Sequence, residues 1–298
     1  MARGYRTPAA LERALTERIV QRFPPNEIQF RRNEIAYRRL VARMYAADPD
    51  RWVIKGGFAM ILRLDPNRTS NDIDVVYLAR AGEHAVALEA LERAVGVDLD
   101  DFFSFEILRV GEETEDRARR VSLLCRLGVR EFVRFRVDLA LPQPHVPVER
   151  IEAPPLTGVD AVDELPPLLA LAWPQQIADK VCAIFERHGD GYSSRARDLA
   201  DLGMIAQQID GLDGDELVDA LRTEEALRRE RSLPDGLPAS FALAELQERD
   251  WRGNFGRASR GAPISFDEAF ASSSALIDPL LRESARGHRW SVVDRAFI

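Results

Sequence analysis

The stretch RWVIKGGFAMILRLDPNRTSNDIDVVYL, residues 51–78, decides how this sequence is interpreted. A short apolar run at 52–54, typical of a buried strand, is followed by the pair Gly56-Gly57, which predicts a turn. A segment with helical spacing and a polar loop then lead to a second apolar run at 73–78, which predicts another strand. The order strand, glycine turn, short helix, loop and strand is more informative than any one of its parts.

The second of these strands begins with two acids. Asp72 and Asp74 are separated by one residue, so on a strand their carboxylates project from the same face. Two adjacent carboxylates repel each other, and a bound Mg²⁺ or Mn²⁺ would relieve that repulsion because both ions prefer oxygen ligands. On its own such a pair is more typical of a solvated strand edge. Asp138, in the probable neighbouring strand FRVDLAL, would supply a third acid for a two-metal site.

The glycines suggest what the acids act on. Without a Cβ, Gly56 and Gly57 let the backbone approach a ligand closely. The N–H groups of such a turn and of the helix that follows can hold phosphate oxygens. Glycines also occur in many strand-to-helix turns for geometric reasons alone. Together with the acids, they indicate phosphate chemistry.

Composition limits the class of protein. The chain has 298 residues, of which 46% are apolar and 30% charged, as in a soluble globular protein of about two domains. No apolar run approaches the roughly 20 residues that span a bilayer, and the first residues lack the apolar segment of a signal peptide. Cys125 and Cys182 are too few for a disulfide framework or a zinc site. We expect a cytoplasmic protein.

The remaining pattern predicts an α+β fold, a mixed sheet with helices followed by a helical C-terminal region. Two helices precede the quoted stretch, three strands are expected between residues 103 and 141, and from Pro166 onward the pattern is helical. We therefore expect three parts: N-terminal helices packed on the core at 1–50, the core itself at 51–155, and a helical C-terminal domain at 156–298 that completes the ligand site.

Basic residues are distributed unevenly. The net charge is −8, which argues against a general nucleic-acid coat, but residues 31–43 carry five arginines and one acid. This segment is consistent with a local basic surface, but an ordinary solvated helix face is the more typical explanation. Only Lys55 and Lys180 are lysines, in a chain with 41 basic residues. Because a lysine presents a point charge and an arginine a planar fork, these two lysines are candidates for a site that requires lysine.

At this point the sequence resembles the polymerase β-like nucleotidyltransferases, and within them the AbiEii/AbiGii (MenT-like) toxin family. The first family motif is Gly-Gly followed by Arg-x-Ser-x-Asp-[Ile/Leu]-Asp. It is matched by Gly56, Gly57, Arg68, Ser70, Asp72, Ile73 and Asp74. The second is a lysine followed by Arg-x-[Lys/Arg]-Asp-x-x-Asp-Leu. It is matched by Lys180, Arg195, Arg197, Asp198, Asp201 and Leu202. Phe58 departs from the small or hydroxyl residue that is common after the glycines.

The resemblance implies a polymerase β-like core and a metal-dependent transfer of NMP from an NTP to an acceptor, with two Mg²⁺ or Mn²⁺ ions. It implies three metal ligands, Asp72, Asp74 and Asp138. It implies a catalytic set that adds Lys180, Asp198 and Asp201 to these. It implies nucleotide contacts from Lys55, Gly56, Gly57, Arg68, Ser70, Lys180, Arg195 and Arg197.

The same resemblance implies a toxin–antitoxin system, with a cognate antitoxin as partner and the 3′ end of tRNA as the acceptor. The arginines of residues 31–43 would then contact RNA phosphates. A phosphate placed on Ser70 would repel metal-bound nucleotide beside Asp72 and block the site.

Three alternatives stay open. The protein could instead modify a small molecule such as an antibiotic, or another protein, or it could bind nucleotide without catalysis. For the second motif, the plain reading of RARDLADL is a surface helix with intrahelical ion pairs.

Overall fold

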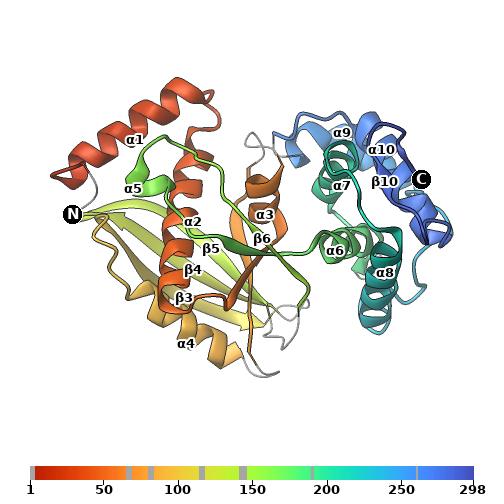
Figure 1. Ribbon diagram of the computed structural model, residues 1–298, viewed down its shortest axis with the longest axis horizontal. Helices are drawn as coiled ribbons and strands as arrows, with labels where there is room; N and C mark the ends of the chain where they lie inside the picture. The colour runs from red at the N-terminus through yellow and green to blue at the C-terminus, as the bar shows by residue number, and fades with distance from the viewer. Residues whose placement is uncertain are drawn as a thin grey trace. The chain divides into compact units, whose positions relative to one another are not determined.

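The protein, represented by a computed structural model (Figure 1), forms two compact units, Met1–Leu171 and Ala172–Ile298. The structure describes residues 4–64, 69–79, 84–113, 118–140, 146–188, 191–259 and 261–298. The boundary expected after residue 155 falls inside the first unit, because the last strand of its sheet comes later in the chain. No helix within these ranges combines the length and the apolar character needed to span a membrane.

The first unit is built on one mixed sheet with the strand order β3-β4-β5-β2-β1-β7-β6. Its elements are α1 (Pro8–Arg22), α2 (Ile28–Ala47), β1 (Trp52–Lys55), α3 (Gly56–Arg63), β2 (Asp72–Tyr77), α4 (His84–Val95), β3 (Phe103–Glu113), β4 (Ala118–Leu127), β5 (Arg130–Ala140), β6 (Val148–Ile151), α5 (Asp160–Asp163) and β7 (Leu168–Leu171). The pairs β1–β7 and β2–β5 are parallel, and the other neighbours are antiparallel. The expected mixed sheet with helices is confirmed.

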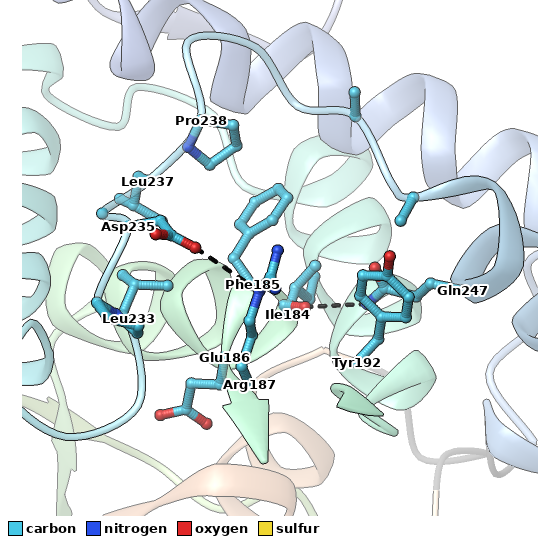
Figure 2. A pocket seen from close by; sticks show the side chains of 14 residues that line it. Ile184, Phe185, Glu186, Arg187, Tyr192, Leu233, Asp235, Leu237, Pro238 and Gln247 are labelled. Atoms are coloured by element: carbon cyan, nitrogen blue, oxygen red, sulfur yellow. Dashed lines mark hydrogen bonds and ion pairs between the residues drawn. The ribbon is translucent and has the colours of Figure 1, made fainter. Parts of the chain in front are cut away.

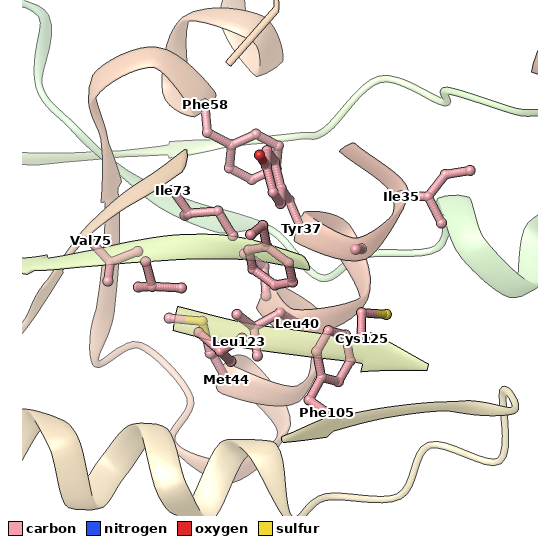
Figure 3. Packing of buried hydrophobic residues seen from close by; sticks show 14 of the residues in the cluster. Ile35, Tyr37, Leu40, Met44, Phe58, Ile73, Val75, Phe105, Leu123 and Cys125 are labelled. Atoms are coloured by element: carbon pink, nitrogen blue, oxygen red, sulfur yellow. The ribbon is translucent and has the colours of Figure 1, made fainter. Parts of the chain in front are cut away.

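The N-terminal helices share a core with the sheet. Helix α1 begins at a capping residue, since Thr7 accepts a hydrogen bond from the N–H of Ala10 at 3.2 Å and Pro8 occupies the first turn. In Figure 3, apolar side chains of α2 lie against those of the strands. Tyr37 of α2 joins the two layers, with its ring centroid 5.1 Å from that of Phe135 in β5 and 5.6 Å from that of Phe58 in α3.

Four of the five arginines of α2, all except the half-buried Arg32, are inside this core, so the expectation of an RNA-facing helix is wrong. Arg38 and Arg43 are at most 1% exposed, and Arg39 is 5% exposed. The Nε of Arg39 lies 2.7 Å from Oδ2 of Asp101, and the Nη2 of Arg43 lies 2.6 Å from Oδ1. These guanidinium groups are neutralised by a buried carboxylate from a distant loop, and they tie α2 to the start of β3 through Phe103, whose carbonyl oxygen accepts from Arg43 at 2.6 Å.

Two strands of the large sheet were missed by the sequence analysis. The proline-rich segment that follows β5 contains β6, and the region after Pro166, expected to be helical throughout, begins with β7. The sequence LLAL of β7 is a short apolar run, and such runs do not distinguish a buried strand from a buried helix. Its position between β1 and β6 explains why it is apolar at every residue, because both faces of an interior strand are covered.

The second unit is mainly helical, as predicted. Its elements are α6 (Trp173–Phe185), β8 (Arg187–His188), β9 (Gly191–Tyr192), α7 (Ala196–Gln208), α8 (Gly214–Arg228), α9 (Glu245–Ala258), α10 (Phe266–Leu281), β10 (Trp290–Ser291) and β11 (Ala296–Phe297). Helices α7 and α10 approach closely at Gly203, where a Cβ would lie 2.7 Å from the Cα of Ala269.

Candidate active site

The first group of predicted residues forms a carboxylate cluster on the sheet. Asp72 and Asp74 alternate with buried Ile73 in β2 and project from one face. The parallel register of β2 and β5 places Asp74 directly opposite Asp138. Because neighbouring strands are about 4.8 Å apart, the half-buried side chains of Asp72, Asp74 and Asp138 are close neighbours.

Two cations flank the cluster in the same cross-strand row. Strand pairing continues from Asp138 to Arg120 in β4 and from Asp74 to Lys55 in β1. Arg120 donates hydrogen bonds from Nε and Nη2 to the two carboxylate oxygens of Asp138, at 2.8 and 2.9 Å. These bonds and the charge of Asp138, with smaller contributions from Asp72 and Asp74, raise the pKa of Arg120 above its usual value. The row therefore runs from Arg120 through the carboxylates of Asp138 and Asp74 to Lys55, with a cation at each end.

Glycine at residue 56 is required by the approach of Asp74. Gly56 is the first residue of α3 and has a φ of +61°, in the left-handed region. A Cβ at this position would lie 2.1 Å from Oδ2 of Asp74 and 2.7 Å from its Cγ. The expected turn is thus the start of the helix itself, which brings the N-terminus of α3 against the carboxylate cluster.

Ser70 lies beneath the cluster. Its hydroxyl is 3.1 Å from the carbonyl oxygen of Asp72 and 3.3 Å from the carboxylate Oδ1 of the same residue. Ser70 is only 3% exposed, and its own carbonyl oxygen accepts a hydrogen bond from the hydroxyl of Tyr37 at 3.3 Å. The serine hydroxyl is therefore directed at the carbonyl and carboxylate oxygens of Asp72 and not at solvent.

The second group of predicted residues lies in the second unit. Lys180 of α6 donates from Nζ to Oδ1 of Asp198 at 2.8 Å and to Oδ2 of Asp201 at 2.5 Å. The two aspartates are three residues apart in α7 and share one face of it. The three side chains are 6%, 7% and 1% exposed, so this is a buried ion cluster and not the surface helix of the alternative interpretation. Arg195 is the N-cap of α7, and Arg197 is half-buried in the first turn.

A separate cavity of about 260 Å³ lies beside the C-terminal end of α6 (Figure 2). Its lining combines apolar side chains with Arg187, Asp235 and Gln247, and Gln247 donates to the carbonyl oxygen of Ile184 at 3.0 Å. None of the predicted site residues lines it. The cavity is therefore distinct from both groups described above.

Comparison with known proteins identifies the family. Residues 38–272 match the family described as "Nucleotidyl transferase AbiEii toxin, Type IV TA system", a range that contains every predicted site residue. The chain belongs to this AbiEii family. As a member it is a nucleotidyltransferase toxin of a type IV toxin–antitoxin system, which implies an NTP substrate and an antitoxin partner.

A solved structure shows the same fold. MenT4, a nucleotidyltransferase toxin from Mycobacterium tuberculosis, is 17% identical, with a TM-score of 0.58 over 97% of this chain and 99% of MenT4. JHP933 from Helicobacter pylori is 16% identical over 88% of this chain and 94% of its own, with a TM-score of 0.47. No curated protein matches the sequence.

AbiEii-type nucleotidyltransferases use divalent metal ions, and the donor set of this chain fits one in part. In the ranges that the structure describes, no group of three or more His, Cys, Asp or Glu side chains is arranged to hold a metal ion. Asp72 and Asp74 nevertheless offer hard oxygen donors on one face, and Mg²⁺ is commonly bound by one or two carboxylates together with substrate phosphates. Both carboxylate oxygens of Asp138 accept hydrogen bonds from Arg120. Asp138 would have to give up part of this contact to act as a third metal ligand.

The predicted residues are thus brought together as two groups, one in each unit. Arg68 lies outside the described residues. Arg120 was missed by the sequence analysis, because an arginine in an arginine-rich strand carries no distinguishing signal. Only its place opposite Asp138 in the sheet marks it.

Proposed function

We propose that this AbiEii toxin transfers NMP from an NTP to the 3′ end of tRNA, and that Asp72 and Asp74 are its principal metal ligands. The proposal is supported above all by one observation. The side chains of Asp72, Asp74 and Asp138 share one sheet face, and the absent Cβ of Gly56 makes room for one of them. This places three carboxylates beside a helix N-terminus, where phosphate oxygens are favoured.

The reaction is a displacement at phosphorus. The 3′-hydroxyl oxygen of the acceptor forms a bond to the α-phosphorus, the bond from that phosphorus to the bridging oxygen breaks, and pyrophosphate leaves. A carboxylate oxygen of the cluster accepts the hydroxyl proton. Divalent ions, when bound, neutralise charge on the attacking and leaving oxygens. Ser70 orients Asp72. The backbone of Gly56 and Gly57 faces the phosphates, and Lys55 lies at the end of the cross-strand row opposite Arg120.

In this proposal Lys180 contacts the phosphates of the nucleotide. Its ammonium is oriented by Asp198 and Asp201, which accept hydrogen bonds from two of its three donors. Lys180→Met should raise the KM for NTP and lower kcat. It should also destabilise the second unit by about 3–5 kcal/mol, because two buried carboxylates lose their partner. Lys180→Arg is the matched variant, since it keeps the charge but not the geometry.

The test is transfer of label. The purified protein is incubated with Mg²⁺, total tRNA and each of the four α-³²P-labelled NTPs in turn. Asp72→Asn keeps the shape of the side chain and removes its charge, and Asp250→Asn, at an exposed position of α9, is the matched control. We expect label in tRNA from the wild type and from Asp250→Asn, and a loss of at least 100-fold in Asp72→Asn.

Other acceptors give distinct outcomes. Label in a small molecule or in a protein, with unlabelled tRNA, would preserve the nucleotidyl transfer and refute the tRNA acceptor. Equal label from wild type and Asp72→Asn would refute the assignment of the carboxylate cluster.

A further inference from the structure

One face of the sheet is lined by arginines. On strands β3, β4 and β5, five arginine side chains point away from the apolar core, on the same side as Ser122 and Leu124. They are Arg109, Arg120, Arg126, Arg134 and Arg136. We call these five residues the arginine face. Glu106 and Glu131 pair with positions of this face outside the aspartate cluster, so the five arginines outnumber these two carboxylates on a protein whose net charge is −8.

The arginine face is open to solvent in the first unit. The side chains of Arg120, Arg126 and Arg134 are 44%, 40% and 63% exposed. Helices α2 and α4 pack on the opposite side of these strands, where Phe105, Val121 and the other apolar residues lie. The apolar residues on the open side of β4 and β5 include Leu124 and Ala140, which are 3% and 9% exposed.

Two of the five arginines have no carboxylate of their own. Arg126 is paired with Glu106 at 3.2 Å, and Arg134 with Glu131 at 2.8 Å. Within the described ranges, by contrast, Arg109 and Arg136 make no ion pair. Both are exposed. An arginine without an ion-pair partner in the protein breaks no ion pair when it binds an external anion, so the free-energy cost of binding is lowest there.

These two arginines lead directly to the carboxylate cluster. Strand pairing sets Arg109 opposite Ser122, Ser122 opposite Arg136, and Arg136 opposite Asp72, which makes one row across four strands. Along β5, Arg136 and Arg134 are about 7 and 13 Å from Asp138. The positive surface is therefore continuous with the site of transfer and extends away from it over several phosphate positions.

The chemistry of the surface favours a phosphate backbone. No aromatic side chain projects from this side of β3, β4 and β5, so bases have nothing to stack on, unlike the open sheets that read RNA through aromatic residues. Guanidinium groups instead match phosphate oxygens in charge and in geometry.

We propose that the arginine face binds the sugar–phosphate backbone of the RNA acceptor and leads its 3′ end to Asp72 and Asp74. This inference rests on the proposed function, because it needs an acceptor that is a nucleic acid. In this proposal the arginine face, and not the mostly buried arginines of α2, supplies the phosphate contacts.

The test measures binding of fluorescein-labelled tRNA by anisotropy between 50 and 300 mM salt. Arg134→Gln/Arg136→Gln removes two contacts, and Arg13→Gln/Arg18→Gln, at exposed positions of α1, is the control with the same change in charge. Each lost phosphate contact should reduce the slope of log K against log salt by about 0.7, and the pair should weaken binding roughly 10- to 30-fold near 0.1 M salt. The control should leave both quantities unchanged.

Four outcomes are decisive. Equal losses in both double variants would overturn the proposal, because the effect would then be one of net charge. A loss of Mg²⁺-NTP affinity in calorimetry, with unchanged RNA binding, would assign the arginines to the NTP and also overturn it. Binding of polyglutamate as tight as that of tRNA would indicate an acidic protein partner instead. Site-dependent RNA binding without transfer of label would support the arginine face and refute the proposed acceptor reaction, so the two can be told apart.

Discussion

Replacing Gly56 with alanine tests whether glycine is required here by Asp74. The new Cβ would lie 2.1 Å from Oδ2 of Asp74 and 2.7 Å from Cγ, so the carboxylate would have to leave its position. The φ of +61° adds a backbone cost of about 1–2 kcal/mol for any other residue. A displacement of about 1 Å at a reacting centre costs on the order of 100-fold in rate. We therefore expect Gly56→Ala to reduce transfer of labelled NMP by at least that factor.

Gly158→Ala separates the two costs. Gly158 also has a left-handed backbone, with a φ of +71°, but a Cβ there would have no neighbour within 4 Å. This variant should lose about 1–2 kcal/mol of stability, seen as a fall in Tm of about 2–8 °C, and should keep the wild-type rate of transfer. The assays are thermal unfolding and the initial rate of label transfer.

A double-mutant cycle makes the reasoning refutable. In an Asp74→Ala background the colliding Cγ and Oδ2 are absent, so adding Gly56→Ala should cost no more stability than Gly158→Ala does. A transfer rate of Gly56→Ala within threefold of wild type would show that Asp74 does not need this space. An equal loss of stability with and without the Asp74 carboxylate would show that the contact is not the cause.

Three further predictions follow from buried groups. Ser70→Ala removes a hydrogen bond worth about 1 kcal/mol, and it should lower kcat several-fold at saturating Mg²⁺ while leaving Tm within about 2 °C; an unchanged kcat would contradict it. Burial alone would raise the pKa of Asp101, but the hydrogen bonds and charge of Arg43 lower this pKa overall. The stability that the Asp101 carboxylate provides is therefore present above about pH 4, and it is lost as the pH falls through the lower pKa of the folded state. Asp101→Asn should therefore cost about 3–5 kcal/mol at pH 7 in urea unfolding and flatten the acid limb, whereas an unaltered acid limb would exclude this carboxylate. Burial raises the pKa of the thiols of Cys125 and Cys182, so iodoacetamide at pH 8 should label neither in the native protein and both in denaturant, as counted by mass spectrometry.

Local patterns in the sequence were sufficient for part of the site. The spacing of Asp72 and Asp74 fixes their common face wherever a strand forms, and a cap followed by proline fixes the start of α1. The sequence analysis grouped the glycine pair with the acids, and Gly56 lies against one of them, Asp74. The sequence could not reveal that the reason is a collision between residue 56 and Asp74, because that contact depends on how α3 returns over β2.

Arg120 shows why cross-strand partners are harder to predict. Counting back from the turn that pairs Leu127 with Arg130, a regular hairpin would set Arg120 opposite Val137, whose side chain points into the core. A bulge between Cys125 and Arg126 shifts the register by one residue, and Arg120 then faces Asp138. A shift of one residue exchanges the faces of a strand, and no feature of the sequence located this bulge.

We predict from the charges of the two groups that transfer requires divalent ions. In the sheet, three aspartates are set against Lys55, Arg120 and Arg136, and in the second unit Asp198 and Asp201 are set against Lys180, so the cations of each group already face carboxylates. An NTP brings further negative charge, and neither group can accept it without added cations. Transfer should fall to background in EDTA and return with Mg²⁺, whereas Ca²⁺, which prefers longer bonds and more ligands, should restore it poorly. If transfer persisted in EDTA, other cations of the chain, such as the arginine face, would have to supply the missing charge, and the carboxylates would then act as bases and not as metal ligands.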